Sequence, residues 1–325
     1  MKKNRLKKKN IFKKLIGAVL IGSLAVGVIG CGKSDKKDDG KHLNIALQKV
    51  PGYIPLYLLR DSDDLKNALK EYDVKINFTE FESGPSENES FAAGQQDIGV
   101  IGNVPAITGI AAGQDRVLVG IAYNGEKTEA TLVPKDSDIT KLEDLKGKKV
   151  GLVVGSIAQN LLDAQLKSVG LSIADVTLVN LSPAEQSVAL ENGEVDAIST
   201  WEPNITKIRK ALDAKVLADG TGIFLGENPI IANKTYVEKN QELVKIFLDE
   251  YRKAAQKVKD NPQAIAKTYA EDFGLEEEDF VSALANAEFP IDLNEADAVD
   301  LQNTVDFLAE SDIIEKTFDI QDYIK

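Results

Sequence analysis

Runs of β-forming residues alternate with helix-forming segments from Leu43 to residue 232. This alternation predicts an α/β fold built in layers, with largely parallel sheets. The predicted strands are Leu43–Leu47, Val74–Phe81, Ile98–Ile101, Val117–Ala122, Ala130–Val133, Lys149–Val154, Val176–Leu181, Val195–Ser199 and Ile230–Ala232. Beyond Val237 the pattern is helical alone, and the predicted helices are Gln241–Asp260, Pro262–Tyr269, Glu276–Ala287 and Asn294–Ser311.

One helix start is specified in detail by the residues around Ser156. Ser156 follows a predicted strand and is a suitable N-cap. From Ile157 to Val169 the apolar residues fall on one face of a 3.6-residue period. Gly170 then suits the position after the last turn, where positive φ is needed. The pattern predicts a helix whose start is exposed at the carboxyl end of a strand.

Two segments, Gly84–Pro105 and Ser182–Pro203, repeat the same pattern. Each has a proline suited to the first turn of a helix, then a glycine, an aspartate that opens a strand, and a second proline. In the second copy Ser182 and Glu185 also form a predicted capping box. Helix–glycine–strand units also recur by chance in α/β proteins. The alternative is two lobes of similar topology that present equivalent turns to a shared cleft.

The N-terminus has the layout of an export signal. Residues 1–14 hold eight basic and no acidic residues, and Leu15–Gly32 is uncharged. Val28-Ile29-Gly30-Cys31 resembles the bacterial lipobox, which implies cleavage before Cys31 and lipid on its sulfur. An uncleaved membrane helix and plain secretion are the alternatives. We therefore expect a signal peptide over residues 1–30, a flexible tether over 31–42, and attachment to the outer face of the cytoplasmic membrane.

Composition excludes several classes of function. Removal of residues 1–30 leaves 31 of the 39 basic residues and all 52 acidic residues. The remaining chain therefore carries a net charge near −21. Such a surface repels nucleic acid. Cys31 is the only cysteine and His42 the only histidine, so neither a Ser/His or Cys/His pair within the domain nor a His/Cys metal cluster is expected. We expect no enzyme, no cofactor and no metal.

Three stretches carry a family resemblance: "EFESGPSENESFAAGQQDIGVIGNVPAI", "LVPKDSDITKLEDLKGKKVGLVVGS" and "LENGEVDAISTWEP". They look like the solute-binding proteins of bacterial ABC importers, nearest to the aliphatic sulfonate, taurine and nitrate group. The match runs from about Leu43 to Pro203 and continues loosely to the C-terminus. The resemblance implies a small-molecule ligand, and the permease and ATPase subunits of an importer as partners.

The resemblance also implies a two-lobed type II periplasmic binding protein fold, with a ligand cleft between the lobes. Two crossover strands would join the lobes near Leu132–Pro134 and Asn228–Ile231. Lobe one would then be residues 43–133 plus 228–325, and lobe two residues 134–227.

Helix starts at strand ends would form the binding site, because unpaired N–H groups and partial positive charge bind oxyanions. Trp201 would pack the apolar part of a ligand, and Glu202 would suit a ligand amine. The alternatives are purely structural roles: Ser156 and Ser182 would only cap helices, Trp201 would lie in the hydrophobic core, and Tyr53 would lie on the surface. The candidate ligand-binding residues are Gln48, Tyr53, Ser83, Gly84, Pro85, Ser86, Asn103, Val104, Pro105, Gly155, Ser156, Gln159, Ser182, Pro183, Thr200, Trp201 and Glu202.

The resemblance makes an aliphatic sulfonate the first expectation for the ligand. Taurine or nitrate-like anions and a heterocyclic vitamin precursor, such as a thiamin pyrimidine, are the alternatives. The matched motifs contain no arginine, which disfavours a compact planar anion such as nitrate. Glu87 and Glu89 lie close to one predicted oxyanion site and are unfavourable there unless they face solvent.

Overall fold

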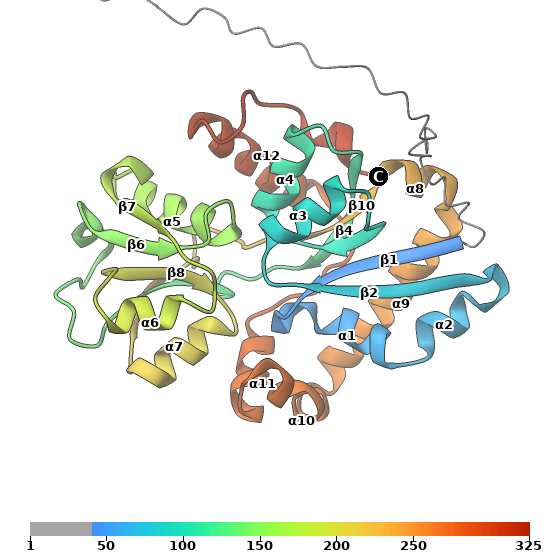
Figure 1. Ribbon diagram of the computed structural model, residues 1–325, viewed down its shortest axis with the longest axis horizontal. Helices are drawn as coiled ribbons and strands as arrows, with labels where there is room; N and C mark the ends of the chain where they lie inside the picture. Colours follow the sequence, from blue (N-terminus) through green and yellow to red (C-terminus); the bar gives the residue numbers. More distant parts are fainter. Residues whose placement is uncertain (1–40) are drawn as a thin grey trace, which may run out of the picture. The chain divides into compact units, whose positions relative to one another are not determined.

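The computed structural model describes residues 41–325. They form two mixed α/β units, each built on a five-stranded sheet (Figure 1). The predicted export signal, Cys31 and nearly all of the predicted tether lie outside these residues. Within them, no helix is both long and apolar enough to cross a membrane.

The two sheets have the same strand topology. The first has the order β2-β1-β3-β10-β4 and the second the order β7-β6-β8-β5-β9. The first sheet consists of β1 Lys41–Gln48, β2 Val74–Phe81, β3 Ile98–Val100, β4 Arg116–Tyr123 and β10 Asn228–Asn233. The second consists of β5 Glu129–Val133, β6 Lys149–Leu152, β7 Thr177–Asn180, β8 Ala197–Trp201 and β9 Lys215–Asp219.

The prediction of largely parallel sheets is confirmed, with one reversed strand in each sheet. In the first sheet β1 pairs in parallel with β2 and β3, but β10 pairs antiparallel with β3 and β4. In the second sheet β6 is parallel to β7 and β8, while β5 is antiparallel to β8 and β9. The reversed strand in each sheet is the one that enters directly from the other sheet, so its direction is set by the crossing and not by a helical crossover.

The chain passes between the sheets twice, through residues 124–128 and 220–227. The sequence placed these crossings near Leu132–Pro134 and Asn228–Ile231. Both predicted segments lie at or within strands, as expected of crossover strands, but a few residues after the connections themselves, because β5 pairs with β8 and β9 while β10 pairs with β3 and β4. Residues 129–133 therefore belong to the second sheet.

Every strand predicted from the sequence is present, with ends shifted by a few residues. Strand β9 was missed. Its sequence, Lys-Val-Leu-Ala-Asp, has a short apolar centre between charged ends, and its residues are only half-buried or exposed at the edge of the sheet. A strand with so little buried surface leaves a weak pattern in sequence.

The repeated segments occupy equivalent positions in the two sheets. The Asp97 carboxylate accepts from the Asn44 amide at 2.7 Å, and the Asp196 carboxylate accepts from the Lys149 amide at 2.8 Å. In return, the amides of Asp97 and Asp196 each donate to the carbonyl of the same partner at 2.9 Å. The repeat therefore marks the same strand entry in both sheets, in favour of two units of similar topology.

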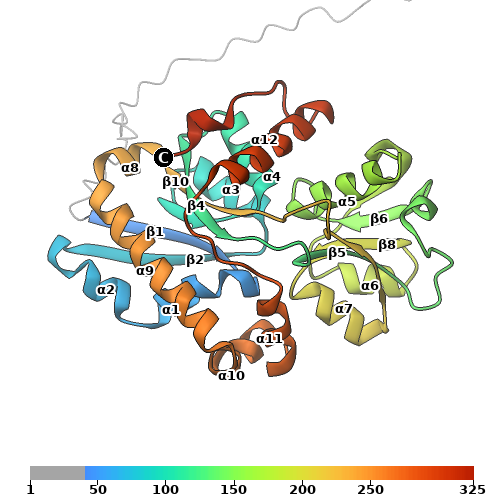
Figure 2. The ribbon, with the colours of Figure 1, turned by 180° about the vertical axis from the view of Figure 1, so that it is seen from behind.

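Helices cover both faces of each sheet (Figures 1 and 2). In the first unit, α1, α2 and α9 pack on one face, and α3, α4 and α12 pack on the other. In the second, α6 and α7 cover one face and α5 the other. The helices are α1 Ile54–Asp61, α2 Asp64–Ala68, α3 Gly84–Ala92, α4 Asn103–Ala111, α5 Ile157–Ser168, α6 Gln186–Glu191, α7 Asn204–Leu212, α8 Lys234–Lys239, α9 Gln241–Asp260, α10 Pro262–Phe273, α11 Glu277–Ala285 and α12 Glu295–Glu310.

The predicted all-helical C-terminal region is confirmed by α9 to α12.

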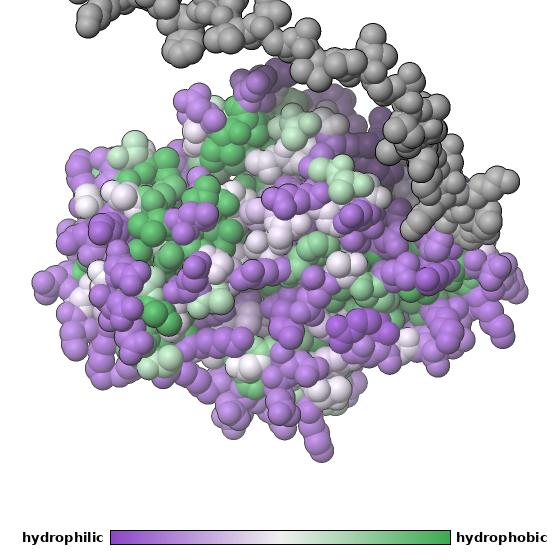
Figure 3. Space-filling view, viewed as in Figure 1, coloured by the Kyte–Doolittle hydropathy of each residue, from purple (hydrophilic) through white to green (hydrophobic). Residues whose placement is uncertain are grey.

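The face shown in Figure 3 is mainly hydrophilic, in keeping with the excess of acidic residues. Hydrophobic residues gather on its left side, over the second unit.

Candidate functional site

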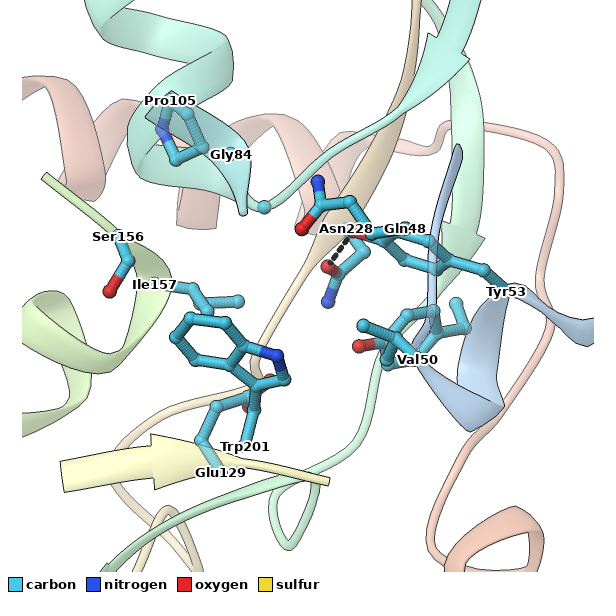
Figure 4. Close-up of a pocket in the computed structure, with 12 residues that line it drawn as sticks. Gln48, Val50, Tyr53, Gly84, Pro105, Glu129, Ser156, Ile157, Trp201 and Asn228 are labelled. Atoms are coloured by element: carbon cyan, nitrogen blue, oxygen red, sulfur yellow. Dashed lines mark hydrogen bonds between the residues drawn. The ribbon is translucent and has the colours of Figure 1, made fainter. Parts of the chain in front are cut away.

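A small cavity lies where the two units meet. Its volume is about 20 Å³, which is room for about one water molecule. The first unit contributes Gln48, Val50, Tyr53, Gly84, Gly102, Pro105, Tyr123 and Asn228. The second contributes Glu129, Ser156, Ile157 and Trp201 (Figure 4).

Six of the candidate residues lie in this lining, although they are far apart in the sequence. They are Gln48, Tyr53, Gly84, Pro105, Ser156 and Trp201. Figure 4 shows Gly84, Pro105 and Ser156 on one side of the Trp201 ring and Glu129 on the other. That these residues contact a ligand remains a prediction, but the fold brings them to one place.

The start of α5 offers unpaired backbone donors to the cavity. Ser156 occupies the N-cap position, but its hydroxyl donates to the Val153 carbonyl at 2.7 Å and does not cap the helix. In the described part of the chain, the amides of Ile157 and Ala158 have no hydrogen-bond partner. Unpaired N–H groups at a helix start carry partial positive charge and suit an anion. Gly170 has φ +76°, as predicted for the residue after this helix.

Glycine allows α3 and α4 to bring their starts together at the cavity. A Cβ on Gly84 would lie 2.4 Å from Pro105 Cγ. No larger residue fits this approach without a shift of the helix. The two starts therefore form one wall of the cavity, opposite α5.

Three candidates on the same helices lie away from the cavity. Asn103 is fully buried, and its Nδ2 donates to Thr304 of α12 at 3.2 Å. Val104 packs in the core beneath α4. Gln159 Oε1 accepts from the Gly155 amide at 2.9 Å, so Gln159 and Gly155 shape the loop that precedes α5.

In the second copy of the repeat, side chains of the turn that precedes α6 form hydrogen bonds with the turn itself. The backbone amide and the hydroxyl of Ser182 both donate to Glu185 Oε2 at 2.8 Å. The predicted capping box was nevertheless wrong, because α6 begins only at Gln186, with Glu185 and not Ser182 at its N-cap position. Pro183 lies in an adjoining groove of about 440 Å³ that shares Val50 and Trp201 with the cavity. Ser182 and Pro183 are therefore outside the central cavity.

The adjoining groove contains two lysines that the sequence did not single out. Lys49 comes from the first unit and Lys207 from α7. Burial, with a contribution from Lys49, lowers the pKa of Lys207. Both are cations beside a cavity whose own lining has none.

The remaining candidates from the sequence lie around the cavity but do not line it. Ser83, Pro85 and Ser86 are half-buried at the start of α3, where the Ser86 hydroxyl donates to the Ser83 carbonyl at 2.8 Å. Thr200 is fully buried and its hydroxyl has no partner among residues 41–325. The Glu202 carboxylate accepts from the amide and hydroxyl of Thr206 at 3.2 and 2.9 Å, so it stabilises α7.

Six lining residues were missed. Gly102 lies inside a quoted motif, and Val50 and Ile157 adjoin predicted residues, so position along the chain carried a signal for them. Tyr123, Glu129 and Asn228 lie at strand ends beside the crossings and had none. The missed residues are Val50, Gly102, Tyr123, Glu129, Ile157 and Asn228.

Tyrosines and an asparagine form the third wall. The rings of Tyr53 and Tyr123 meet edge to face, with centroids 5.5 Å apart. The Tyr53 hydroxyl donates to Asn228 Oδ1 at 2.8 Å, and Asn228 Nδ2 donates to the Gly226 carbonyl at 3.0 Å. These bonds hold the asparagine and both rings in place before a ligand arrives, which lowers the cost of binding.

Two buried carboxyls lie in or beside the cavity. Glu87 is fully buried and accepts from Gln48 Nε2 at 2.8 Å, whereas Glu89 is exposed. Burial raises the pKa of Glu87 to about 8 and that of Glu129 to about 8. Glu87 is thus mainly neutral at pH 7 and does not oppose an anion, although it faces inward. Among residues 41–325, no cluster of three or more His, Cys, Asp or Glu fits a metal ion.

Comparison with known proteins agrees with this geometry. A model of the family described as "NMT1/THI5 like" matches residues 69–265. A protein of Bacillus subtilis (strain 168), provisionally named an aliphatic sulfonates-binding protein, is 32% identical over 302 residues, 91% of this chain and 90% of its own length.

Two solved structures are similar over nearly their whole length. The alkanesulfonate-binding protein SsuA of Xanthomonas axonopodis pv. citri, bound to MOPS, has a TM-score of 0.79 and 27% identity, covering 87% of this chain and 98% of its own. The periplasmic aliphatic sulphonate binding protein SsuA of Escherichia coli has a TM-score of 0.76 and 30% identity, covering 87% and 97%. The resemblance seen in the sequence is thereby confirmed, and the chain belongs to the NMT1/THI5-like family, with the two-sheet fold of periplasmic binding proteins.

Proposed function

We propose that this protein is an extracytoplasmic receptor that captures a small sulfonate and delivers it to an ABC importer. The observation that carries the proposal is the cavity between the units, where the unpaired amides at the start of α5 face an aromatic wall. The similarity to sulfonate-binding proteins supports the same ligand class.

The geometry suits a ligand with an anionic head and a short apolar tail. The head would accept from the amides of Ile157 and Ala158 and from polar side chains such as Gln48. Hydrogen bonds to a charged group contribute roughly 1.5–3 kcal/mol each, so a few of them offset the cost of association. The tail would pack against Trp201, where an apolar group loses water.

The two sheet units would act as lobes that separate to admit the ligand. The cavity holds about 20 Å³, far less than a sulfonate needs, so entry requires movement. Residues 124–128 and 220–227 are the connections that would bend. The predicted lobe limits stay a proposal, with residues 129–133 moved to the second lobe because β5 lies in its sheet.

A heterocyclic ligand is the second candidate. Tyr53, Tyr123 and Trp201 place three aromatic rings around one small cavity, and rings of this kind stack on a planar heterocycle. Nitrate is less favoured, because no guanidinium lines the cavity.

A thermal-shift screen separates these ligands. We expect the melting temperature of the full-length protein to rise with ethanesulfonate and taurine but not with sulfate or nitrate. A ligand that binds only the folded state adds roughly 2.7 kcal/mol at one hundred times its Kd. A rise only with a thiamin pyrimidine would replace the sulfonate with the heterocycle. We also propose that the protein binds without catalysis, so the NMR spectrum of ethanesulfonate should stay unchanged after long incubation.

We further propose that lipid on Cys31 holds the receptor at the outer face of the cytoplasmic membrane. The lone cysteine after an uncharged segment supports this. Cys31→Ser should release the exported protein from the membrane fraction, as lipid no longer anchors it. A variant that still sediments with membranes after export would favour the uncleaved helix.

A further inference from the structure

Glu129 is buried between the two crossing segments, in surroundings that favour a proton on its carboxyl group. Its side chain is 1% exposed, and Oε2 lies 2.7 Å from Thr128 Oγ1. The same hydroxyl donates to the Gly125 carbonyl oxygen at 2.8 Å. A threonine hydroxyl has one proton, and a carbonyl oxygen has none to give. An ionised Glu129 would have to share this one proton with the Gly125 carbonyl, whereas a protonated Glu129 could donate to the Thr128 oxygen and leave each contact its own proton.

No positive charge balances an ionised Glu129. Its Oε1 has no partner among the described residues, and no Lys, Arg or His lines the cavity. A Cβ on Gly226 would lie 2.4 Å from Oε2, so the backbone of the second crossing segment lies directly against the carboxyl. A buried carboxylate without a partner is unstable relative to its acid.

The titratable groups around Glu129 also favour the acid. Burial is the largest influence and raises the pKa of Glu129; the hydrogen bond from Thr128 lowers this pKa, and the like charge of Glu202, after β8, raises it. Tyr123 of β4 and Tyr53 before α1 also face it, and burial holds both phenols neutral.

The crossing segments themselves supply no counter-charge. On the first segment, Glu126 and Lys127 are exposed to solvent. On the second, Glu227 interacts with Asp297 and Asp300 of α12.

We propose that Glu129 carries a proton whenever the cavity is closed, and that capture of a monoanionic ligand therefore takes up a proton from solvent. This inference rests on the proposed function, since it needs an anion to bind in the cavity. The bound anion itself favours the proton, because it places a second negative charge beside the carboxyl. The receptor thus binds a sulfonate and a proton together.

Proton uptake requires that Glu129 lose its proton more easily when the units separate. Its surroundings come from both units and both crossing segments, so separation would let water reach it. Glu87 offers the contrast, because its carboxyl lies against Gln48 and Gly99 of its own sheet. Separation leaves Glu87 buried, so its proton should not depend on the ligand.

The test is calorimetric titration of the full-length protein with ethanesulfonate, a monoanion without an amine. Buffers must lack sulfonate groups, so phosphate, imidazole and Tris replace the zwitterionic sulfonic acids. The binding enthalpy should vary with the ionisation enthalpy of the buffer, with a slope of up to one proton taken up. The Kd should rise by up to tenfold per pH unit above the pKa that Glu129 has in the ligand-free protein.

Two variants assign the proton. Glu129→Gln replaces the acid with a neutral amide that can still donate to Thr128, so its Kd should no longer vary with pH. Its proton uptake should vanish. Glu87→Gln is the matched control, and it should keep the pH dependence and the uptake of the wild type.

Three results would overturn the inference. A wild-type Kd independent of pH, with no proton uptake, would show that Glu129 does not change its proton on binding. Tight binding of taurine that is lost in Glu129→Gln, without uptake for ethanesulfonate, would show an ionised carboxylate that holds the ligand amine. No binding of ethanesulfonate by wild type or variant at any pH would instead remove the proposed function, and this inference with it.

Discussion

Gly102 and Trp201 occupy equivalent positions in the two units, yet one is the smallest residue and the other the largest. Each lies four residues after the first residue of the equivalent strand, which is Ile98 of β3 in the first unit and Ala197 of β8 in the second. Both line the cavity. Gly102 leaves room for Ile157 of the second unit. The ring of Trp201, in contrast, fills the space beside Ile157.

The helix starts of the two units differ in the same way. In the first unit Gly84, at the start of α3, lines the cavity, although the Ser86 hydroxyl accepts from the Ser83 amide there at 3.3 Å. In the second unit Glu185 takes the same role at the corresponding turn, which lies outside the cavity, and the start of α5 lines the cavity instead. Repeated topology thus fixes where turns lie, and the side chains decide which of them can bind a ligand.

The largest expected effect is the loss of the Trp201 ring. Trp201→Ala should raise the Kd of ethanesulfonate at least about 30-fold, or roughly 2 kcal/mol, because the ligand tail loses its main apolar wall. Trp201→Phe should keep most of the affinity. Calorimetry on both variants, with thermal unfolding to confirm the fold, measures this. Equal affinity in the alanine variant would place the ligand elsewhere.

The next largest effect should come from filling the space at Gly102. Its φ of −62° suits any residue, so a substitution tests space and not backbone strain. A Cβ would lie 3.1 Å from Ile157 Cβ in the other unit. Gly102→Val should raise the Kd about tenfold, because the added methyl groups keep the starts of α4 and α5 apart. Gly102→Ala should have a smaller effect.

Stopped-flow measurement of ethanesulfonate binding checks whether closure is what the valine impairs. The association rate should stay near the wild-type value and the dissociation rate should rise, since the units meet less closely once the ligand is bound. An unchanged Kd in Gly102→Val would mean that the two units need not approach each other at this point.

The fold was largely readable from the sequence because period and turn residues are local signals. The strands, the C-terminal helices and the repeat were all predicted from such patterns. The largely parallel sheets were predicted because strand–helix alternation normally produces them, but the one reversed strand in each sheet was not, since a strand that crosses from another sheet has no local mark. The same limitation shifted the crossings away from their predicted positions.

Only half of the residues that line the cavity were predicted from the sequence, for a related reason. Gly84, Pro105, Ser156 and Trp201 were found because helix starts and strand ends have recognisable residues. In the sequence Glu129 only marks the start of a run of β-forming residues. Its pairing opposite Trp201, which the sequence does not show, brings it to the cavity. Ser182 had a stronger capping signal than Ser156, and that signal marked a turn that satisfies itself.

The smallest expected effect tests that closed turn. The Ser182 amide, and then its hydroxyl, lower the pKa of Glu185. A carboxyl with a lowered folded-state pKa stabilises the protein above its unfolded pKa, and this contribution is lost as pH falls through the folded value. Glu185→Gln should therefore melt slightly below the wild type at pH 7, by less than about 3 °C, and match it in acid. Its Kd for ethanesulfonate should be unchanged, because Ser182 and Glu185 do not line the cavity. A change in Kd would mean that the second copy of the repeat also takes part in binding.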